Sequence, residues 1–219
     1  MEKNLAILIA DLSGYTALTE AHGATSAADL IETFLKIVQN SLVGDSHLHQ
    51  RRGDEVMIIS ESPENLLSTA LLLLRNSAKE HNFLLLHGGL HFGPVLKRDD
   101  EYFGSVVNFT ARIASKAKAG TFCCSKEFRD AIINSKLCVL EPMGTHELKN
   151  ISEEKEIFQV ITDQANFLTI DPVCRMLILS EQKAIPHPHE REVFFCSENC
   201  LNIYDSKKMS KNGVDLRSS

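Results

Sequence analysis

The stretch AILIADLSGYT, residues 6–16, is an apolar run that ends in a single carboxylate, Asp11. A short continuous apolar run followed by a turn, here at Ser13-Gly14, predicts a buried strand over residues 4–10. A charged group at the rim of a core is costly to desolvate, so Asp11 should be paired, exposed or bound to a cation. The rest of the sequence decides among these three.

Composition and the lengths of the apolar stretches lead us to expect a cytoplasmic protein. The chain has 219 residues, of which 43% are hydrophobic, and a net charge of -6, so a sizeable core is expected and no basic block points to nucleic acid. The longest apolar stretches, LAILIA and LLSTALLLL, fall well short of the roughly 18 residues that cross a bilayer, and no signal sequence opens the chain. We therefore expect no nucleic-acid partner and no membrane partner.

The order of expected elements favours an α+β fold, with helices on one face of a mainly antiparallel sheet. The first domain should span residues 1–163, followed by a small module over 164–219 that ends in a disordered tail. After the first strand, the expected elements are a helix over 25–42, a hairpin over 47–60, a helix over 63–78, a strand and its return over 82–104, a helix over 105–118, short elements over 121–147 and a strand over 156–161.

Three separate pieces carry candidate chemistry. Asp11 ends the first strand, Asp54 lies in the turn of the hairpin, and VNFTAR, residues 107–112, lies on a helix. Asn108 and Arg112 are four positions apart, so they share one face of that helix. Each piece alone is weak, because a Gly-Asp pair is usually only a turn and polar helix residues are usually solvated.

Together and in this order, the pieces resemble the class III nucleotidyl cyclase catalytic domain. The likeness covers roughly residues 4–163 and implies the ferredoxin-like α+β fold of that family. The matching text is ILIADLSGYT (7–16), RRGDEVM (51–57), YFGSVVNFTARI (102–113) and ELKNISEEKEIFQV (147–160).

The resemblance implies that Asp11 and Asp54 bind two Mg²⁺ or Mn²⁺ ions. Two such ions would lower the pKa of the ribose 3′ hydroxyl and neutralise the triphosphate, and hard cations prefer carboxylate oxygens. The turn after Asp11 should offer backbone N–H groups to phosphate oxygens, with Gly14 permitting close approach. These turn residues are Leu12, Ser13, Gly14, Tyr15 and Thr16.

By the same resemblance, Asn108 orients the ribose and Arg112 stabilises charge on the α-phosphate. In this family the carboxylates and the Asn/Arg pair of one site come from opposite protomers. The resemblance therefore implies a homodimer with two shared sites and an inactive monomer.

The positions that read the base depart from the family pattern. Gln50 and Glu101 stand where the commonest adenylyl-forming members have Lys and Asp. The Glu101 carboxylate can accept a hydrogen bond from the adenine amino group and would repel the guanine carbonyl oxygen. The Gln50 amide can form a hydrogen bond with either base. We expect an ATP substrate rather than GTP, and cyclic AMP as the product. The altered pair leaves open a non-catalytic nucleotide- or metal-binding module with the same fold.

The C-terminal segments DPVCRM (171–176) and FFCSENC (194–200) resemble the small YHS-type metal-binding module, over about residues 168–208. That resemblance implies that Cys174, Cys196 and Cys200 bind Zn²⁺ or Cu⁺. A small core held by packing alone is the alternative.

No fourth ligand is evident beside the three cysteines of the tail. His187 and His189 in the PHPH segment are candidates, although such a turn is typical of a solvated loop. The other histidines show no ligand spacing, and His22 is interpreted with them as structural or surface. Cys123, Cys124 and Cys138 are expected in or near the core.

Overall fold

The computed structural model describes residues 2–98, 101–103, 105–132, 137–151, 153–162, 169–178 and 184–212. The expected domain boundary at residue 163 lies outside these ranges, and so do residues 213–219 of the expected disordered tail. The five helices found within them are α1 (Tyr15–Ser41), α2 (Pro63–Ser77), α3 (Ser105–Ala114), α4 (Lys126–Ala131) and α5 (Glu198–Asn212). None of these helices is long and apolar enough to span a bilayer.

The described part of the chain forms one large mixed sheet in the order β2-β3-β1-β5-β7-β9-β8, with β6 beside β5. Only the β5–β7 pair in that sheet is parallel. The strands of the large sheet are β1 (Glu2–Leu12), β2 (His47–Arg52), β3 (Glu55–Ser60), β5 (Leu86–Arg98), β6 (Glu101–Phe103), β7 (Thr121–Ser125), β8 (Val139–His146) and β9 (Lys155–Ile161). The remaining short strands are β4 (Phe83–Leu84), β10 (Thr169–Ile170), β11 (Met176–Ile178), β12 (Ile185–Pro186) and β13 (Phe194–Phe195).

Strand β1 runs through the middle of the sheet, which explains its unbroken apolar sequence. Ala6, Leu8 and Ala10 belong to the core cluster that includes residues of α1 and α2. Leu5, Ile7 and Ile9 belong to a second cluster, which includes Val106 and Ala114 of α3. Because successive strand residues point to opposite faces, both faces of β1 are covered.

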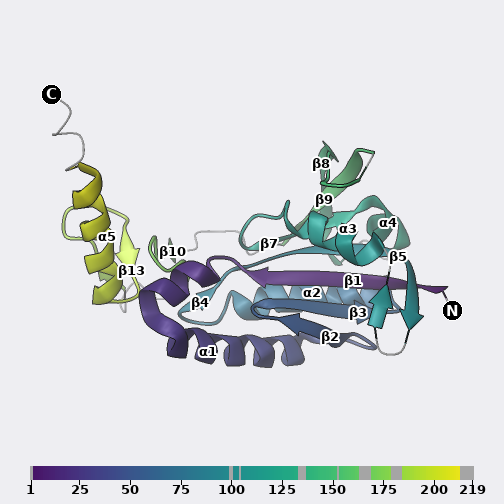
Figure 1. Cartoon of the computed structure of the whole chain (residues 1–219), viewed down its shortest axis with the longest axis horizontal. Coiled ribbons are helices and arrows are strands. Elements are labelled where there is room, and N and C mark those ends of the chain that lie inside the picture. Colours follow the sequence, from purple (N-terminus) through teal and green to yellow (C-terminus); the bar gives the residue numbers. More distant parts are fainter. Residues whose placement is uncertain are drawn as a thin grey trace.

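The predicted α+β fold is confirmed, but the prediction that the helices share one face of the sheet is corrected by the structure. The sequence predicts helices on one face of the sheet, where α1 and α2 pack, but α3 covers the opposite face. Figure 1 shows α1 and α3 on opposite sides of β1. Contact is close at Gly89, where an added Cβ would lie 2.4 Å from the Ala114 backbone nitrogen and 2.6 Å from the Thr110 carbonyl oxygen. Glycine in β5 therefore lets α3 approach the sheet.

Helix α1 begins ten residues earlier than the sequence predicts. Gly14, with φ of 97°, occupies the N-cap position, and no side chain caps this end of the helix. The expected capping signal is therefore missing from the sequence. Gly23 breaks the helical backbone with φ of 81°, so a first segment precedes the part that the apolar periodicity indicates. This first segment ends at His22.

The C-terminal residues pack against the N-terminal end of α1 and against β4. Strand β11 pairs with β4 through Met176↔Leu84 and Leu177↔Phe83, which extends a small sheet from one region into the other. Ala21 of α1 packs against a separate small core. Figure 1 shows α5 and β13 beside the start of α1. The buried residues of this small core are Cys174, Phe195 and Cys200.

Candidate active site

Asp11 continues the row of β1 residues that face α3. It follows Ile9 on that face and is partly buried, opposite His87 of β5 in the antiparallel ladder. One carboxylate oxygen accepts the backbone N–H of Leu12 at 3.0 Å. The Asp11 carboxyl group also lies within hydrogen-bonding reach of Asp54 in the neighbouring hairpin turn.

Asp54 lies in that turn, between β2 and β3. The preceding Gly53 has φ of 64°, which a glycine adopts without strain. Burial, followed by a hydrogen bond with Asp11 and the charge of Asp11, raises the pKa of Asp54 to about 6. Two carboxyl groups that repel each other in this way, with oxygen ligands only, form a donor set suited to hard divalent cations.

His87 is a neighbour of this carboxylate pair that the sequence reasoning missed. Its Nδ1 lies 3.1 Å from the Ser13 hydroxyl, and burial lowers the pKa of its ring even though the charge of Asp54 works in the opposite direction. The neutral ring can therefore hold the Ser13 side chain. Nothing in the spacing of the histidines indicates this contact, because it depends on the register between β1 and β5.

The turn after Asp11 is only partly available to a ligand. The Leu12 N–H is bonded to Asp11, and the Ser13 N–H is bonded to the Leu85 carbonyl at 2.8 Å. The N–H groups of Tyr15 and Thr16 lie in the first turn of α1, where backbone donors have no partner within the helix. Of the five predicted phosphate donors, Leu12 and Ser13 are thus already bonded within the protein, whereas Tyr15 and Thr16 are not bonded within the helix.

Asn108 and Arg112 line a separate cavity of about 550 Å³. The lining also includes Lys149, which precedes β9, Lys155, the first residue of β9, and Glu127 of α4. No ion pair within the described ranges involves Arg112, so its guanidinium is available to an anion. The excess of positive charge suits a phosphorylated ligand.

The structure does not bring the predicted carboxylates and the Asn/Arg pair into one pocket. Among the described residues that line the cavity, neither Asp11 nor Asp54 appears. One chain therefore presents two half-sites, a carboxylate pair at the β1–hairpin edge and a basic cavity beside α3.

The strands that carry the predicted base-reading residues, β2 and β6, are not adjacent in the sheet, but a side-chain contact joins them. Gln50 is exposed on β2, next to a register irregularity in the β2–β3 ladder. Glu101 begins β6, whose backbone pairs with β5. The rings of His49 and Tyr102 meet edge to face with centroids 4.9 Å apart, which joins β2 to β6.

A second cluster of chemistry lies in the C-terminal region. Cys174, Cys196 and Cys200 are brought together, as the sequence predicts, and the imidazole of His22 joins them from α1. Hydrogen bonds among the thiols shift two of their pKa values in opposite directions. The hydrogen bond with Cys196 is the largest cause of the raised pKa of Cys174, and the hydrogen bond with Cys174 is the largest cause of the lowered pKa of Cys200. The structure therefore places His22, which shows no ligand spacing in the sequence, beside the three thiols.

Several solved structures with the same fold are cyclases. An adenylate cyclase from Trypanosoma brucei aligns over 75% of this chain and 91% of its own, with a TM-score of 0.69 and 19% identity. The adenylyl cyclase CyaB from P. aeruginosa aligns over 76% and 98%, with a TM-score of 0.62 and 18% identity. The guanylate cyclase domain of RhGC from Catenaria anguillulae aligns over 74% and 98%, with a TM-score of 0.62 and 17% identity.

Curated relatives match part of the chain at higher identity. An uncharacterized protein of Mycobacterium tuberculosis is 35% identical over 124 residues, which is 56% of this chain and 33% of the relative. An adenylate cyclase of Glutamicibacter nicotianae is 34% identical over 117 residues, which is 53% of this chain and 29% of the relative. The chain thus spans about a third of the length of the curated relatives that it matches.

No family model matches the chain, so the likeness of its tail to a YHS-type module stays a prediction. The region from β1 to β9 has the fold of the class III adenylate and guanylate cyclase catalytic domain.

Proposed function

We propose that this chain is a nucleotidyl cyclase that converts ATP to cyclic AMP and pyrophosphate. The observation that carries the proposal is the convergence of Asp11 and Asp54, two carboxyl groups from distant segments that lie close enough to share a hydrogen bond. Bound Mg²⁺ or Mn²⁺ would lower the pKa of the ribose 3′ hydroxyl and neutralise phosphate charge. Asp11 and Asp54 would hold these ions.

The second half-site supplies the groups that the reaction needs at phosphorus. Arg112 can donate two parallel hydrogen bonds to oxygens of the α-phosphate, where negative charge develops during attack by the 3′ oxygen. Asn108, one helical turn before it, faces the same cavity and can hold the ribose. Lys149 adds positive charge for the departing pyrophosphate, whereas the ammonium group of Lys155 is paired with Glu153 at 2.9 Å.

The separation of the half-sites supports a homodimer. Two-fold symmetry places the same surface of both protomers in contact, so a carboxylate pair of one can face the basic cavity of the other. Two complete sites would then form per dimer, and the monomer would lack both.

Adenine is the base that we propose. The carboxylate of Glu101 and the amide of Gln50 match the amino group and N1 of adenine, whereas guanine would present a carbonyl oxygen to Glu101. Several curated relatives carry the name adenylate cyclase, which agrees with this choice.

Subunit complementation tests activity and assembly together. Asp54→Ala and Arg112→Ala proteins should each be inactive with Mn²⁺ and ATP. Mixing them in equal amounts should restore about a quarter of wild-type cyclic AMP formation, because half of the dimers would be mixed and each of those has one intact site. A mixture that stays inactive, although mixed dimers are shown to form, would exclude shared sites. Absence of product from wild-type protein with either ATP or GTP would favour a binding module instead.

A further inference from the structure

The four side chains of the C-terminal cluster have the composition and spacing of a closed metal site. Their ligand atoms all lie within 4.8 Å of one another. The Cys174 and Cys196 sulfurs are 3.5 Å apart, and the Cys196 and Cys200 sulfurs are 3.8 Å apart. His22 Nε2 lies 3.3 Å from the Cys200 sulfur and 3.6 Å from the Cys196 sulfur. Separations of this size surround a tetrahedral centre with Zn–S bonds of about 2.3 Å and Zn–N bonds of about 2.0 Å.

A buried carboxylate holds the cysteine segments in place. Asp171 is fully buried, and one of its oxygens accepts the backbone N–H groups of Val173 and Cys174 at 2.7 and 3.0 Å. Its other oxygen accepts the N–H of Cys196 at 2.8 Å. One side chain therefore fixes two ligand-bearing segments, as supporting residues around metal sites commonly do.

The backbone of α1 aims His22 at the thiols. The helix breaks at Gly23, directly after His22, so the first segment of α1 can take its own direction. The Asn199 side chain donates a hydrogen bond to the Ala21 carbonyl at 2.8 Å, which fixes α5 to the residue before His22. The break at Gly23 and the hydrogen bond to Ala21 together fix the backbone on both sides of His22.

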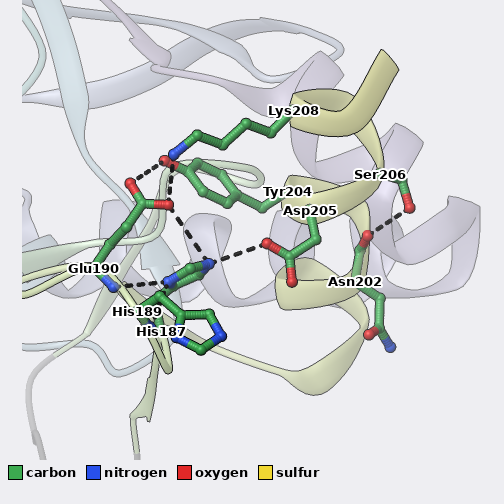
Figure 2. Close-up of polar contacts among 8 residues, drawn as sticks. All are labelled: His187, His189, Glu190, Asn202, Tyr204, Asp205, Ser206 and Lys208. Carbon is green, nitrogen blue, oxygen red and sulfur yellow. Dashed lines mark hydrogen bonds and ion pairs between the residues drawn. The ribbon is translucent and has the colours of Figure 1, made fainter. Parts of the chain in front are cut away.

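The histidines of the PHPH segment have other roles. His187 Nε2 lies 3.0 Å from Asp205, and its Nδ1 receives the backbone N–H groups of His189 and Glu190. Figure 2 shows the His187 ring between Glu190 and Asp205, beside α5. Both ring nitrogens of His187 are thus engaged, and His189 is exposed. Neither histidine belongs to the cluster of potential metal ligands among the described residues.

We propose that His22 is the fourth ligand of a Cys₃His zinc site that joins the C-terminal region to helix α1 of the cyclase fold. Three thiolates and one imidazole satisfy the tetrahedral preference of Zn²⁺ and leave no open position for substrate, so the ion is structural. Binding would displace the thiol protons, because the thiolate is the ligand form.

The zinc site would hold the C-terminal region against the turn that follows Asp11. A Cβ added at Gly14 would lie 2.7 Å from both Cβ and Cγ of Arg175, the residue after Cys174. The ligand segment is therefore in direct contact with the N-cap of α1. Release of zinc would loosen this contact as well as the cluster itself.

Metal binding by the full-length protein tests the ligand set without reference to catalysis. Purified under reducing conditions, the wild type should retain about one equivalent of zinc, and Co²⁺ substitution should give the absorption of a tetrahedral thiolate centre. The His22→Ala variant should bind at least about 100-fold more weakly, since loss of a mere supporting residue already costs 10- to 100-fold. His189→Ala is the matched control and should bind as the wild type does. Equal affinity of His22→Ala and wild type, or loss of binding in the control, would overturn the assignment.

Hydrogen exchange separates a bridging site from one confined to the tail. Removal of zinc from the wild type with a chelator should raise exchange over residues 15–22 of α1, and readdition should reverse it. The His22→Ala protein should show the raised exchange with zinc present. Zinc-independent exchange over these residues would overturn the bridging role. Selective retention of Cu⁺ in place of zinc would overturn the choice of metal.

Discussion

Replacing Asp54 by Asn should stabilise the cation-free protein at neutral pH. The pKa of Asp54 is raised to about 6 from the ordinary value of 3.8, chiefly by burial and then by Asp11. A carboxyl group whose pKa is higher in the folded protein than in the unfolded chain stabilises the folded state at a pH below the unfolded pKa. This stabilisation is lost as the pH rises through the folded pKa. Charged Asp54 therefore destabilises the protein above about pH 6, and the neutral amide removes that cost.

The expected gain is modest because the side chain of Asp54 is partly exposed. The shift corresponds to an upper limit of about 3 kcal/mol, and screening by solvent reduces it to about 1–2 kcal/mol. In a chain of this size, such a gain should raise the melting temperature by roughly 3–6 °C. At pH 4 the gain should nearly vanish, because Asp54 is then largely protonated in the folded protein.

Thermal and urea unfolding in EDTA and in Mn²⁺ would measure this effect. Saturating Mn²⁺ should stabilise the wild type more than Asp54→Asn, so the order of stability should reverse. Asp45→Asn is an informative control. Although burial opposes it, hydrogen bonds from Asn65 and Ser60 lower the pKa of Asp45 to about 2, so this substitution should destabilise the protein at neutral pH. An Asp54→Asn protein that is less stable than wild type in EDTA, with equal responses of both to Mn²⁺, would refute the reasoning.

Three other predictions concern α3 and its surroundings. Arg112→Lys should lower cyclase activity by roughly 100-fold or more, since an ammonium cannot replace the guanidinium fork, while denaturation curves stay unchanged. Burial lowers the pKa of His91 to about 4 although Glu127 opposes this shift. Stability should therefore fall by about 3 kcal/mol as the pH drops from 6.5 to 4, and His91→Gln should flatten that profile in acid titrations. Gly89→Ala should destabilise by about 1–3 kcal/mol in urea titrations, because its Cβ would collide with the α3 backbone, and it should reduce activity by displacing Arg112.

Much of the fold follows from local signals in the sequence. The Ser62-Pro63 start of α2 is confirmed, with the Ser62 hydroxyl accepting the Asn65 N–H. The hairpin that carries Asp54 also forms as predicted. The start of α1 was missed because Gly14 offers no capping side chain, and Gly23 separates the two helical segments. The glycine-rich segment over residues 86–98 forms one long strand. Its place in the sheet explains this, because its amino acids do not by themselves favour a strand.

The candidate site is predictable where a motif is local and unpredictable where it depends on tertiary contacts. Asp11, Asp54, Asn108 and Arg112 lie in short recognisable segments, although their division between two half-sites emerges only from the packing of α3. His22 is 174 positions from Cys196, so no ligand spacing could connect them. The three cysteines alone indicate a metal and leave its last ligand open.

Three contacts that the sequence did not reveal meet at one place, the turn between Asp11 and α1. His87 contacts Ser13, the Leu85 carbonyl accepts the Ser13 N–H, and Arg175 packs on Gly14. This turn is thus held on one side by the sheet and on the other by the segment that carries Cys174. A change in the C-terminal region should therefore affect the half-site that contains Asp11 and Asp54 more than it affects the cavity that contains Arg112. In cyclase assays, loss of zinc should accordingly weaken the response to Mn²⁺ in a protomer that supplies the carboxylates, and it should have less effect in a protomer that supplies only Arg112.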